Sequence, residues 1–366
     1  MVNLIISWYK SAIKIMKKQL ALFTVTIMVL MSCSQNTKQD ATSIREMPED
    51  IQPTQQLFAN THEAVCYSGF RTGQHPDRGE GAVNPSAEET LEDLNLLKEH
   101  LGTSLIRLYD CGENSQLVLE TIKDNNLNIK VLLGVWLKAE LSAHETCSWL
   151  AEPIPDSILK YNKAVNLMEI SKGIELANQY QDIIVGINVG NEALVEWNDH
   201  KVDTDTIISY VQGIQANIVQ PVTVADNYLW WAENGSNLAE VVDFVSVHIY
   251  PVWEGKNIEE AMSYTLQNFQ QVRDSLPNSN IVITEAGWTS IASEFGDRAS
   301  EEHQKRYYQE IMAWSEANNI TTFFFEAFDE DWKGNPDNMM GAEKHWGLFN
   351  VDRTPKQVVN AMSIAE

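Results

Sequence analysis

Two glutamates, Glu192 and Glu285, stand at the ends of short apolar runs, an unusual place for a charged side chain. The first run reads GINVGNE at 186–192, and the second reads IVITEAGW at 281–288. A carboxylate is costly to bury unless it is paired or has a chemical task. Two carboxyl groups that face each other across one pocket suit glycosidic bond cleavage, because one protonates the leaving oxygen while the other, ionised, attacks the sugar.

From residue 61 onward the chain alternates between short apolar runs and longer amphipathic stretches. Most of the runs are rich in Val, Ile, Leu and Phe and are apolar on both faces, as in strands that helices cover. The predicted strands lie near residues 64–69, 104–109, 129–136, 183–189, 221–225, 242–249, 281–285 and 321–325. Eight strands that alternate with helices over about 300 residues favour a (β/α)8 TIM barrel in one catalytic domain. The alternative is an open doubly wound sheet, but no GxGxxG motif follows the first strand.

Helix signals agree with this alternation. Ser86 and Glu89 have the spacing of a capping box, and a leucine-rich helical face follows them until Gly102. A second apolar face with helical spacing occupies residues 258–276. Both segments are therefore predicted to be helices between strands.

In such a barrel the chemistry lies at the carboxyl ends of the strands. Glu192 follows the fourth predicted strand and Glu285 ends the seventh, so both side chains are expected at one mouth. A single glutamate in such a position would more simply cap a helix or pair with an arginine. Two glutamates at matching strand ends, with Asn191 directly before the first, favour a catalytic pair.

Several segments together carry a family resemblance. VGNE at 189–192 and TEAGWTS at 284–290 resemble the acid/base and nucleophile motifs of glycoside hydrolase family 17, a family of (β/α)8 β-1,3-glucanases and related transglycosylases. Its strand-end and closing motifs are similar to YSGFRTGQ at 67–74, IRLYDC at 106–111, VSVHIYP at 245–251, FFFEAFDEDWKG at 323–334 and EKHWGLFNVDRTPK at 343–356. The resemblance spans about residues 61–360 and is strongest to bacterial lipoprotein laminarinases.

The resemblance implies roles for individual residues. Glu192 matches the general acid/base and Glu285 the nucleophile of a retaining reaction. Asn191 is expected to bind the sugar hydroxyl beside the reacting carbon, and Tyr250 to hydrogen-bond the nucleophile. Tyr109 and Asp110, after strand two, match residues on the rim of the family's site. Glu330 and Lys333 match the acidic residue and the lysine after strand eight that support the site. The chain departs from the family at two positions. The family often has asparagine where this chain has Asp329, and commonly has glutamine where this chain has Trp332.

The chain has 11 tryptophans, and aromatic planes stack on the C–H faces of sugar rings. Trp288 and Trp332 follow strands seven and eight and are the tryptophans expected to contact sugar, whereas Trp136 and Trp314 are expected in the core. Arg71 and Asp226 either line the pocket or make structural hydrogen bonds at its rim. The longest connection, residues 137–161, either forms a wall of the groove or only covers the barrel.

The composition of the chain narrows the classes of ligand that it can bind. The formal net charge is −25, which argues against nucleic acid and other anionic polymers and fits a neutral β-1,3-glucan polysaccharide. The chemistry above requires no cofactor or metal. DEDWKG at 329–334 imitates the start of a calcium loop, but Lys333 at position 5 and Met340 at position 12 break the ligand set.

The N-terminal residues resemble a bacterial lipoprotein signal. Lysines at 17 and 18 precede an apolar run over residues 20–31, and Cys33 follows a small residue. We expect residues 1–33 to be the signal peptide, with 1–15 upstream of a better start at Met16, 34–60 a flexible tether, and 61–366 the hydrolase domain. Cys33 would carry the lipid. Ser34, directly after it, resembles the residue at this position in lipoproteins that are sorted to the outer membrane. Which face of that membrane the protein occupies stays open. The simpler alternative is an anchor helix.

Three cysteines remain after Cys33: Cys66, Cys111 and Cys147. An odd number does not form a complete disulfide framework, so a Cys66–Cys111 bridge and buried free thiols both stay open. We expect a monomer.

These observations predict a retaining endo-β-1,3-glucanase that acts on laminarin-type glucan through a covalent glycosyl-enzyme. A transglycosylase on the same scaffold would use the same residues and is the first alternative. A glucan-binding lipoprotein without activity is the second, although binding alone needs no acid/base pair.

Overall fold

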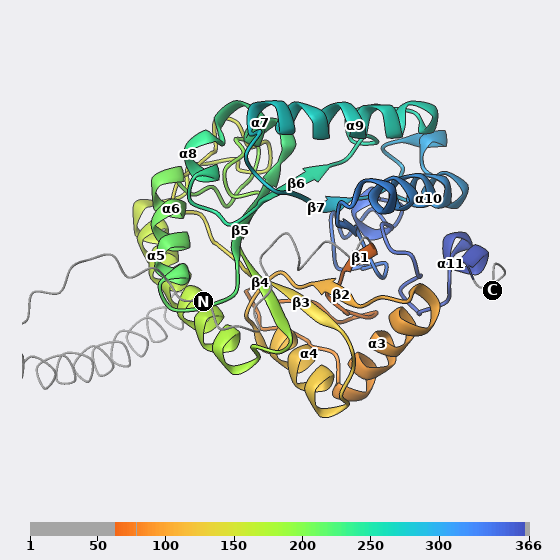
Figure 1. The fold of residues 1–366 in the computed structure, drawn as a ribbon, viewed down its shortest axis with the longest axis horizontal. Coiled ribbons are helices and arrows are strands. Elements are labelled where there is room, and N and C mark those ends of the chain that lie inside the picture. The colour runs from red at the N-terminus through yellow and green to blue at the C-terminus, as the bar shows by residue number, and fades with distance from the viewer. Residues whose placement is uncertain (1–62, 78, 363–366) are drawn as a thin grey trace, which may run out of the picture. The chain divides into compact units, whose positions relative to one another are not determined.

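The computed structural model describes residues 63–77 and 79–362, and in this part of the chain eight parallel strands close a barrel in the order β1 to β8 (Figure 1). The strands are β1 (Glu63–Cys66), β2 (Leu105–Arg107), β3 (Lys130–Val135), β4 (Ile184–Asn191), β5 (Val222–Asn227), β6 (Val245–Ile249), β7 (Ile281–Ala286) and β8 (Thr322–Phe324). β1 pairs with both β2 and β8, which closes the sheet. The predicted (β/α)8 fold is confirmed.

Helices surround the strands, as Figure 1 shows. They are α3 (Ala87–Leu101), α4 (Glu113–Asp124), α5 (Asp156–Gln179), α6 (Thr204–Gln215), α7 (Tyr228–Asn234), α8 (Ser236–Ala239), α9 (Ile258–Ser275), α10 (Glu301–Asn318) and α11 (Gln357–Met362), with 3-10 turns η1 (Gly296–Arg298) and η2 (Ala342–Lys344). The predicted capping box of Ser86 and Glu89 is present, and Gly102 ends α3 with a φ of 63°. Within the described residues, no helix is both long enough and apolar enough to cross a membrane.

Alternate residues along the strands divide the core into two layers. One small cluster includes Ala64, Cys66, Leu105, Leu132, Phe244, Val282 and Phe323, and the alternation assigns it to the barrel interior. A much larger cluster fills the space between the strands and the helices. The barrel is therefore a packed core, and its chemistry lies at one end.

Strand β7 carries an irregularity beside the site. Val247 of β6 pairs with Ile283 and the next residue, His248, pairs with Glu285, so Thr284 is an extra residue in β7. A bulge of this kind reverses the direction in which the following side chains point. Glu285 therefore shares the inward direction of His248.

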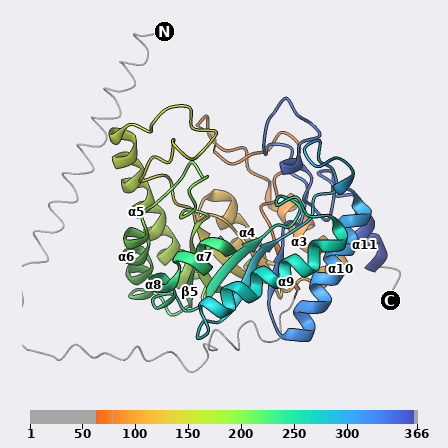
Figure 2. The ribbon, with the colours of Figure 1, turned by 90° about the horizontal axis from the view of Figure 1, so that it is seen from above.

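The connection before α5 and the connection after β8 stand on the same side of the barrel (Figure 2). Cys66, Cys111 and Cys147 are buried free thiols, which decides against the Cys66–Cys111 bridge. The expected signal peptide with Cys33 and the expected tether at 34–60 lie outside the described residues.

Candidate active site

A cavity of about 1630 Å³ occupies the mouth of the barrel and contains both Glu192 and Glu285. Residues at or beyond the carboxyl end of each of the eight strands line it, from Ser68 after β1 to Trp346 after β8. Ligand pockets for single small molecules usually measure about 300–1,000 Å³. The cavity is therefore large enough for a ligand of several linked rings.

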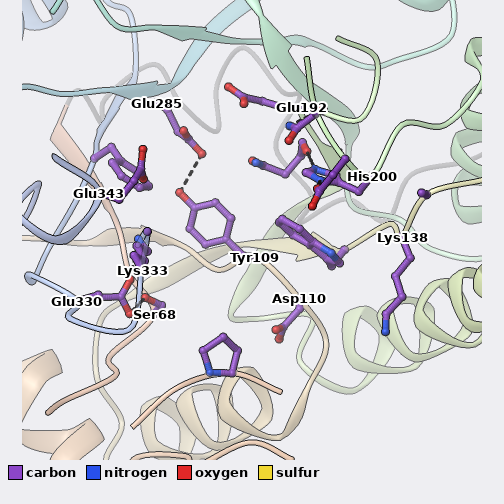
Figure 3. A pocket seen from close by; sticks show the side chains of 18 of the residues that line it. Ser68, Tyr109, Asp110, Lys138, Glu192, His200, Glu285, Glu330, Lys333 and Glu343 are labelled. Atoms are coloured by element: carbon purple, nitrogen blue, oxygen red, sulfur yellow. Dashed lines mark hydrogen bonds and ion pairs between the residues drawn. The ribbon is translucent and has the colours of Figure 1, made fainter. Parts of the chain in front are cut away.

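Glu285 lies at the base of this cavity and is almost completely buried. Its Oε1 accepts a hydrogen bond from Arg107 Nη1 at 2.7 Å. The same oxygen accepts a second hydrogen bond from Tyr109 Oη at 2.9 Å, drawn as a dashed line in Figure 3. Its Oε2 accepts a hydrogen bond from Tyr250 Oη at 2.6 Å. Burial raises the pKa of this carboxyl, but His248, Arg107 and the two tyrosine hydroxyls outweigh it and hold the pKa below its usual value. Glu285 is therefore kept ionised, as a nucleophile must be.

Arg107 and His248 connect the two glutamates, and neither was predicted to be a site residue. Arg107 is fully buried and also donates to Asn191 Oδ1 at 2.6 Å. Its Nη1 donates to Glu285 Oε1 and to Thr284 O and lies 3.2 Å from His248 Nε2. The other ring nitrogen of His248, Nδ1, donates to Glu192 Oε1 at 2.9 Å and lies 3.5 Å from Glu285 Oε2.

Glu192 directly follows β4 and has a left-handed backbone with a φ of 49°. This conformation costs a non-glycine residue about 1–2 kcal/mol. The Glu192 N–H donates to Ala225 O, and its carbonyl accepts a hydrogen bond from the Asn198 amide. The side chain is 23% exposed, against 6% for Glu285. One oxygen of each glutamate lies within 4.8 Å of the other.

Glu192, His248 and Glu285 each offer one potential ligand atom, and these three atoms are close enough together to coordinate a metal ion. A divalent cation at this position would face the fixed positive charge of Arg107, which already binds Glu285 Oε1. It would also compete with the two tyrosine hydroxyls for the same carboxylate. The surroundings of the set therefore favour acid–base chemistry over metal binding.

A second charged cluster follows β8. Lys333 Nζ lies 2.7 Å from both Glu326 Oε2 and Glu330 Oε2, and all three groups are largely buried. Burial raises the pKa of Glu326 well above its usual value, against the opposing charge of Lys333. Burial also opposes the ionisation of Glu330, but Lys333 and hydrogen bonds from Ser68 and Trp332 lower its pKa. One lysine therefore pairs with two buried carboxyl groups, and these ion pairs hold the segment after β8 in place at this side of the cavity.

The structure brings most of the predicted site residues together. Those that line the cavity are Glu192, Glu285, Asn191, Tyr109, Asp110, Tyr250, Glu330, Trp332 and Lys333. The Asp110 carboxylate accepts hydrogen bonds from Gly112 N and Ser115 Oγ, so it also orders the start of α4. The expected hydrogen bond between Tyr250 and Glu285 is present.

Three predicted residues lie elsewhere. Trp288 is fully buried and its indole donates to Arg298 O, because side chains beyond the β7 bulge alternate and this one points outward toward α10. Asp226 is buried and accepts hydrogen bonds from Leu194 N and Asn227 N. Arg71 pairs with the buried Asp93. The expectation of sugar contact at Trp288 is corrected, and Arg71 and Asp226 are structural.

Other aromatic side chains line the cavity where Trp288 was expected to contact sugar. Trp346 lines the cavity and packs edge-on against Tyr250, with ring centroids 5.2 Å apart. Trp136, expected in the core, also lines the cavity, together with Trp149 from the long connection. That connection therefore forms a wall of the cavity. Trp346 stands in the closing motif at 343–356, which was the available sequence signal.

Comparison with known proteins agrees with this geometry. A family model described as the BtgE/BtgC glycoside hydrolase domain matches residues 64–347. A glucan 1,3-beta-glucosidase of Arthroderma benhamiae is 28% identical over 282 residues, which cover 72% of this chain and 82% of the relative.

Solved structures show the same barrel. An endo-laminarinase from Formosa Hel1_33_131 is 25% identical with a TM-score of 0.71, over 86% of this chain and 90% of that one. A family 17 β-1,3-glucanosyltransferase from Rhizomucor miehei shares the fold with a TM-score of 0.62 and 23% identity, over 82% and 97% of the two chains. The chain thus belongs to the BtgE/BtgC glycoside hydrolase domain family, within glycoside hydrolase family 17, and is a glycoside hydrolase.

Proposed function

We propose that the protein cleaves laminarin-type β-1,3-glucan within the chain, with retention of configuration at the reacting carbon. The observation that carries this proposal is the pair of Glu192 and Glu285, with one oxygen of each within 4.8 Å of the other. Retaining enzymes hold their carboxyl groups about 5–5.5 Å apart, and inverting enzymes about 6.5–9.5 Å apart. The separation is shorter than the inverting range, and so supports direct attack by Glu285.

The first step joins the sugar to the enzyme. Glu285 attacks the anomeric carbon while Glu192 gives its proton to the glycosidic oxygen, so the bond breaks and the reducing-end part departs with a new hydroxyl. Glu192, now ionised, takes a proton from water, and the water oxygen attacks the anomeric carbon and releases Glu285. The two environments support this division of roles, because Glu285 is held ionised by Arg107 and two tyrosines.

His248 supports the role of Glu192. Its Nδ1–H donates to Glu192 Oε1, so a proton for the leaving group belongs on Oε2, the other oxygen. The same Nδ1 also lies 3.5 Å from Glu285 Oε2, so the imidazole contacts both glutamates. Asn191, held by Arg107, is positioned to bind the hydroxyl next to the reacting carbon.

The charge of the cavity supports a neutral substrate. The acidic residues that line it are Asp77, Asp110, Glu169, Glu192, Asp199, Glu254, Glu285, Glu330 and Glu343, against the lysines Lys138 and Lys333. Such a surface repels sulfated and uronic acid polymers. Aromatic side chains on several of its walls suit glucose units, which combine apolar ring faces with neutral hydroxyls.

Transfer of the glycosyl group to a second sugar is the other candidate activity. The observation in its favour is the size of the cavity, in which an acceptor chain fits beside the glycosyl-enzyme. The same two glutamates serve both reactions, and they differ only in whether water or a sugar hydroxyl attacks in the second step.

The test is incubation of the purified protein with laminarin, with β-1,4-glucan and with mixed-linkage glucan, beside Glu192→Gln, Glu285→Gln and the exposed control Glu175→Gln. We expect a ladder of β-1,3-linked oligosaccharides from wild type and the control, and a loss of about 10³-fold or more in the other two variants. The anomeric form of the first product, read by NMR, reports retention. Products longer than the starting oligosaccharide would indicate transfer. No cleavage of any glucan would refute the proposal.

We also propose that Cys33 carries a lipid that anchors the protein to the bacterial outer membrane. The order of charged, apolar and small residues before Cys33 supports it. In cells fed labelled palmitate, wild type is expected to acquire the label and Cys33→Ala to remain unlabelled. Label in both proteins would contradict the assignment.

A further inference from the structure

Trp149 is an unusually exposed tryptophan in the connection between β3 and α5. Its exposed fraction is 70%, the largest among the exposed large hydrophobic side chains of the described residues. Tryptophan is usually well buried, and an exposed one beside a polar groove marks a contact surface. Trp149 also lines the catalytic cavity, as do Leu150, Ile154 and Ile158, which follow it in the sequence. The cavity therefore continues onto an apolar surface at this end.

The Trp149 connection is joined to the connection that Glu192 begins. Glu140 N and Leu141 N both donate to Lys201 O, at 2.9 and 3.0 Å. Thr146 Oγ1 donates to Glu196 O at 2.5 Å. These bonds, all at residues before Trp149, link the β3–α5 and β4–α6 connections, so the two connections form one unit.

Three more aromatic rings belong to the same unit. Trp136 and Trp197 line the cavity, and the Trp136 ring stacks on His200, with centroids 4.8 Å apart and planes inclined by 34°. His200 Nε2 donates to Asn191 O, which ties the stack to the residue before Glu192. We call Trp136, Trp149, Trp197 and His200 the aromatic wall.

The aromatic wall lies on the Glu192 side of the cavity. In Figure 3, Glu192 and His200 lie on one side, and Lys333, Glu330 and Glu343 lie on the other, beyond Glu285. Because Glu192 gives its proton to the leaving oxygen, the departing part of the substrate lies beside Glu192 and the residues that follow it. The wall therefore faces the leaving-group side of the scissile bond.

We propose that the aromatic wall binds the reducing-end part of a long β-1,3-glucan chain, with Trp149 as its outermost sugar-stacking site. The proposal rests on the proposed function and deepens it, because it names the surface that makes the enzyme favour polymer over short oligosaccharide. The exposed Trp149 ring and the aliphatic Ile154 and Ile158 meet the C–H faces of glucose units, and the surrounding solvent leaves their hydroxyls hydrated. The same wall would hold an acceptor chain in a transfer reaction.

The test compares Trp149→Ala, Trp149→Phe and Tyr161→Ala. Tyr161 is a matched control, because it is an aromatic residue of α5 with 59% exposure that does not line the cavity. Two substrates are used: laminarin, and laminarihexaose labelled at its reducing end. For Trp149→Ala we expect KM for laminarin to rise about 2- to 12-fold, the effect of one aromatic stacking contact, with kcat unchanged.

The length of the labelled hexaose fragments reports on which side of the scissile bond Trp149 binds sugar. Loss of binding on the leaving-group side shifts cleavage toward the reducing end, so Trp149→Ala should release shorter labelled fragments than wild type. Trp149→Phe, which keeps a flat ring, should restore much of the wild-type pattern, and Tyr161→Ala should match wild type. Unchanged kinetics and fragments in Trp149→Ala, or longer labelled fragments, would overturn the proposal.

Failure of the proposed function has a different signature. If wild type cleaved no glucan, equilibrium binding of laminarin would still test the wall. Weaker binding by Trp149→Ala than by Tyr161→Ala would support it, and equal binding would refute it.

Discussion

At the scale of single residues, Glu192 and Glu285 have the same chemistry in two environments. Glu285 is surrounded by one guanidinium and two tyrosine hydroxyls, and its pKa is lowered despite burial. Glu192 receives one hydrogen bond from His248 and is more exposed. This difference, rather than the residue type, supports the assignment of nucleophile and acid.

Removal of the Tyr250 hydroxyl is expected to change the pH profile. Glu285 must be ionised to attack, so activity is lost as pH falls through its lowered pKa. Tyr250→Phe removes a hydrogen bond to the ionised form, which raises that pKa and moves the acid limb of kcat/KM to higher pH. We expect kcat/KM to fall about 10- to 100-fold, the effect of a hydrogen bond to a charged group.

The control for this experiment is Tyr210→Phe, which removes a tyrosine hydroxyl from Glu140, a carboxylate that does not line the cavity. Its acid limb should match that of wild type. An acid limb of Tyr250→Phe that stays in place would show that the hydroxyl does not stabilise the ionised nucleophile.

Lys333 is expected to be essential for stability. Lys333→Met leaves Glu326 and Glu330 buried without their cation, which costs about 3–5 kcal/mol in the free energy of unfolding. Without the cation, burial raises the pKa of both carboxyls in the folded state, so the loss should shrink as pH falls and they become protonated.

Urea unfolding at pH 7 and at pH 5 measures this change. The exposed pair of Lys172 and Glu175 offers a control, since Lys172→Met should change stability by less than about 0.5 kcal/mol. A Lys333→Met variant as stable as wild type at pH 7 would contradict a structural role for the cation.

At the scale of elements, the direction of each side chain depends on strand irregularities and on close contacts between strands. The extra residue Thr284 in β7 turns Glu285 into the mouth and sends Trp288 toward α10. Gly134 in β3 allows the segment that follows β2 to approach, because a Cβ at this position would lie 2.4 Å from the Tyr109 carbonyl carbon. The position of Tyr109 against Glu285 therefore depends on a glycine in the neighbouring strand.

Gly134→Ala is expected to destabilise the protein by about 1–3 kcal/mol, because the methyl group meets backbone that cannot move freely. The same clash displaces Tyr109, so kcat should fall as well. Gly213→Ala in α6 is the matched control: its Cβ meets nothing within 4 Å, and alanine in a helix should add about 0.5–1 kcal/mol. Thermal unfolding and laminarin hydrolysis measure both effects, and equal shifts in the two variants would contradict the argument.

At the scale of the whole molecule, charge is expected to discriminate between neutral and anionic substrates. The chain carries a formal net charge of −25, and acidic residues predominate in the cavity as well. A field of one sign over a cleft excludes ligands of the same sign, and salt weakens this exclusion.

Carboxymethylated β-1,3-glucan should therefore be a poorer substrate than the unmodified polymer, with kcat/KM lower by about tenfold or more at low salt. The gap should narrow in about 1 M salt, where the screening length is about 3 Å. Reducing-end release from both polymers at two salt concentrations tests this. A gap that does not change with salt would point to steric exclusion instead.

Much of the architecture followed from local patterns. Eight apolar runs, the capping box at Ser86 and the glycine after α3 depend on neighbours in sequence, and the barrel formed as they indicate. Both glutamates were recognisable because a charge at the end of a buried strand needs a reason, and the sequence alone pointed to the carboxyl ends of the strands as their place.

The tertiary structure decided which side chains surround them. Arg107 and Glu285 are 178 residues apart, and only closure of the barrel brings them to 2.7 Å. The choice of Trp346 and Trp136 over Trp288 for the cavity depends on a bulge and on the folding of long connections, neither of which leaves a periodic trace in the sequence. Local spacing determines elements, whereas contacts between distant segments determine which way the side chains of a site point.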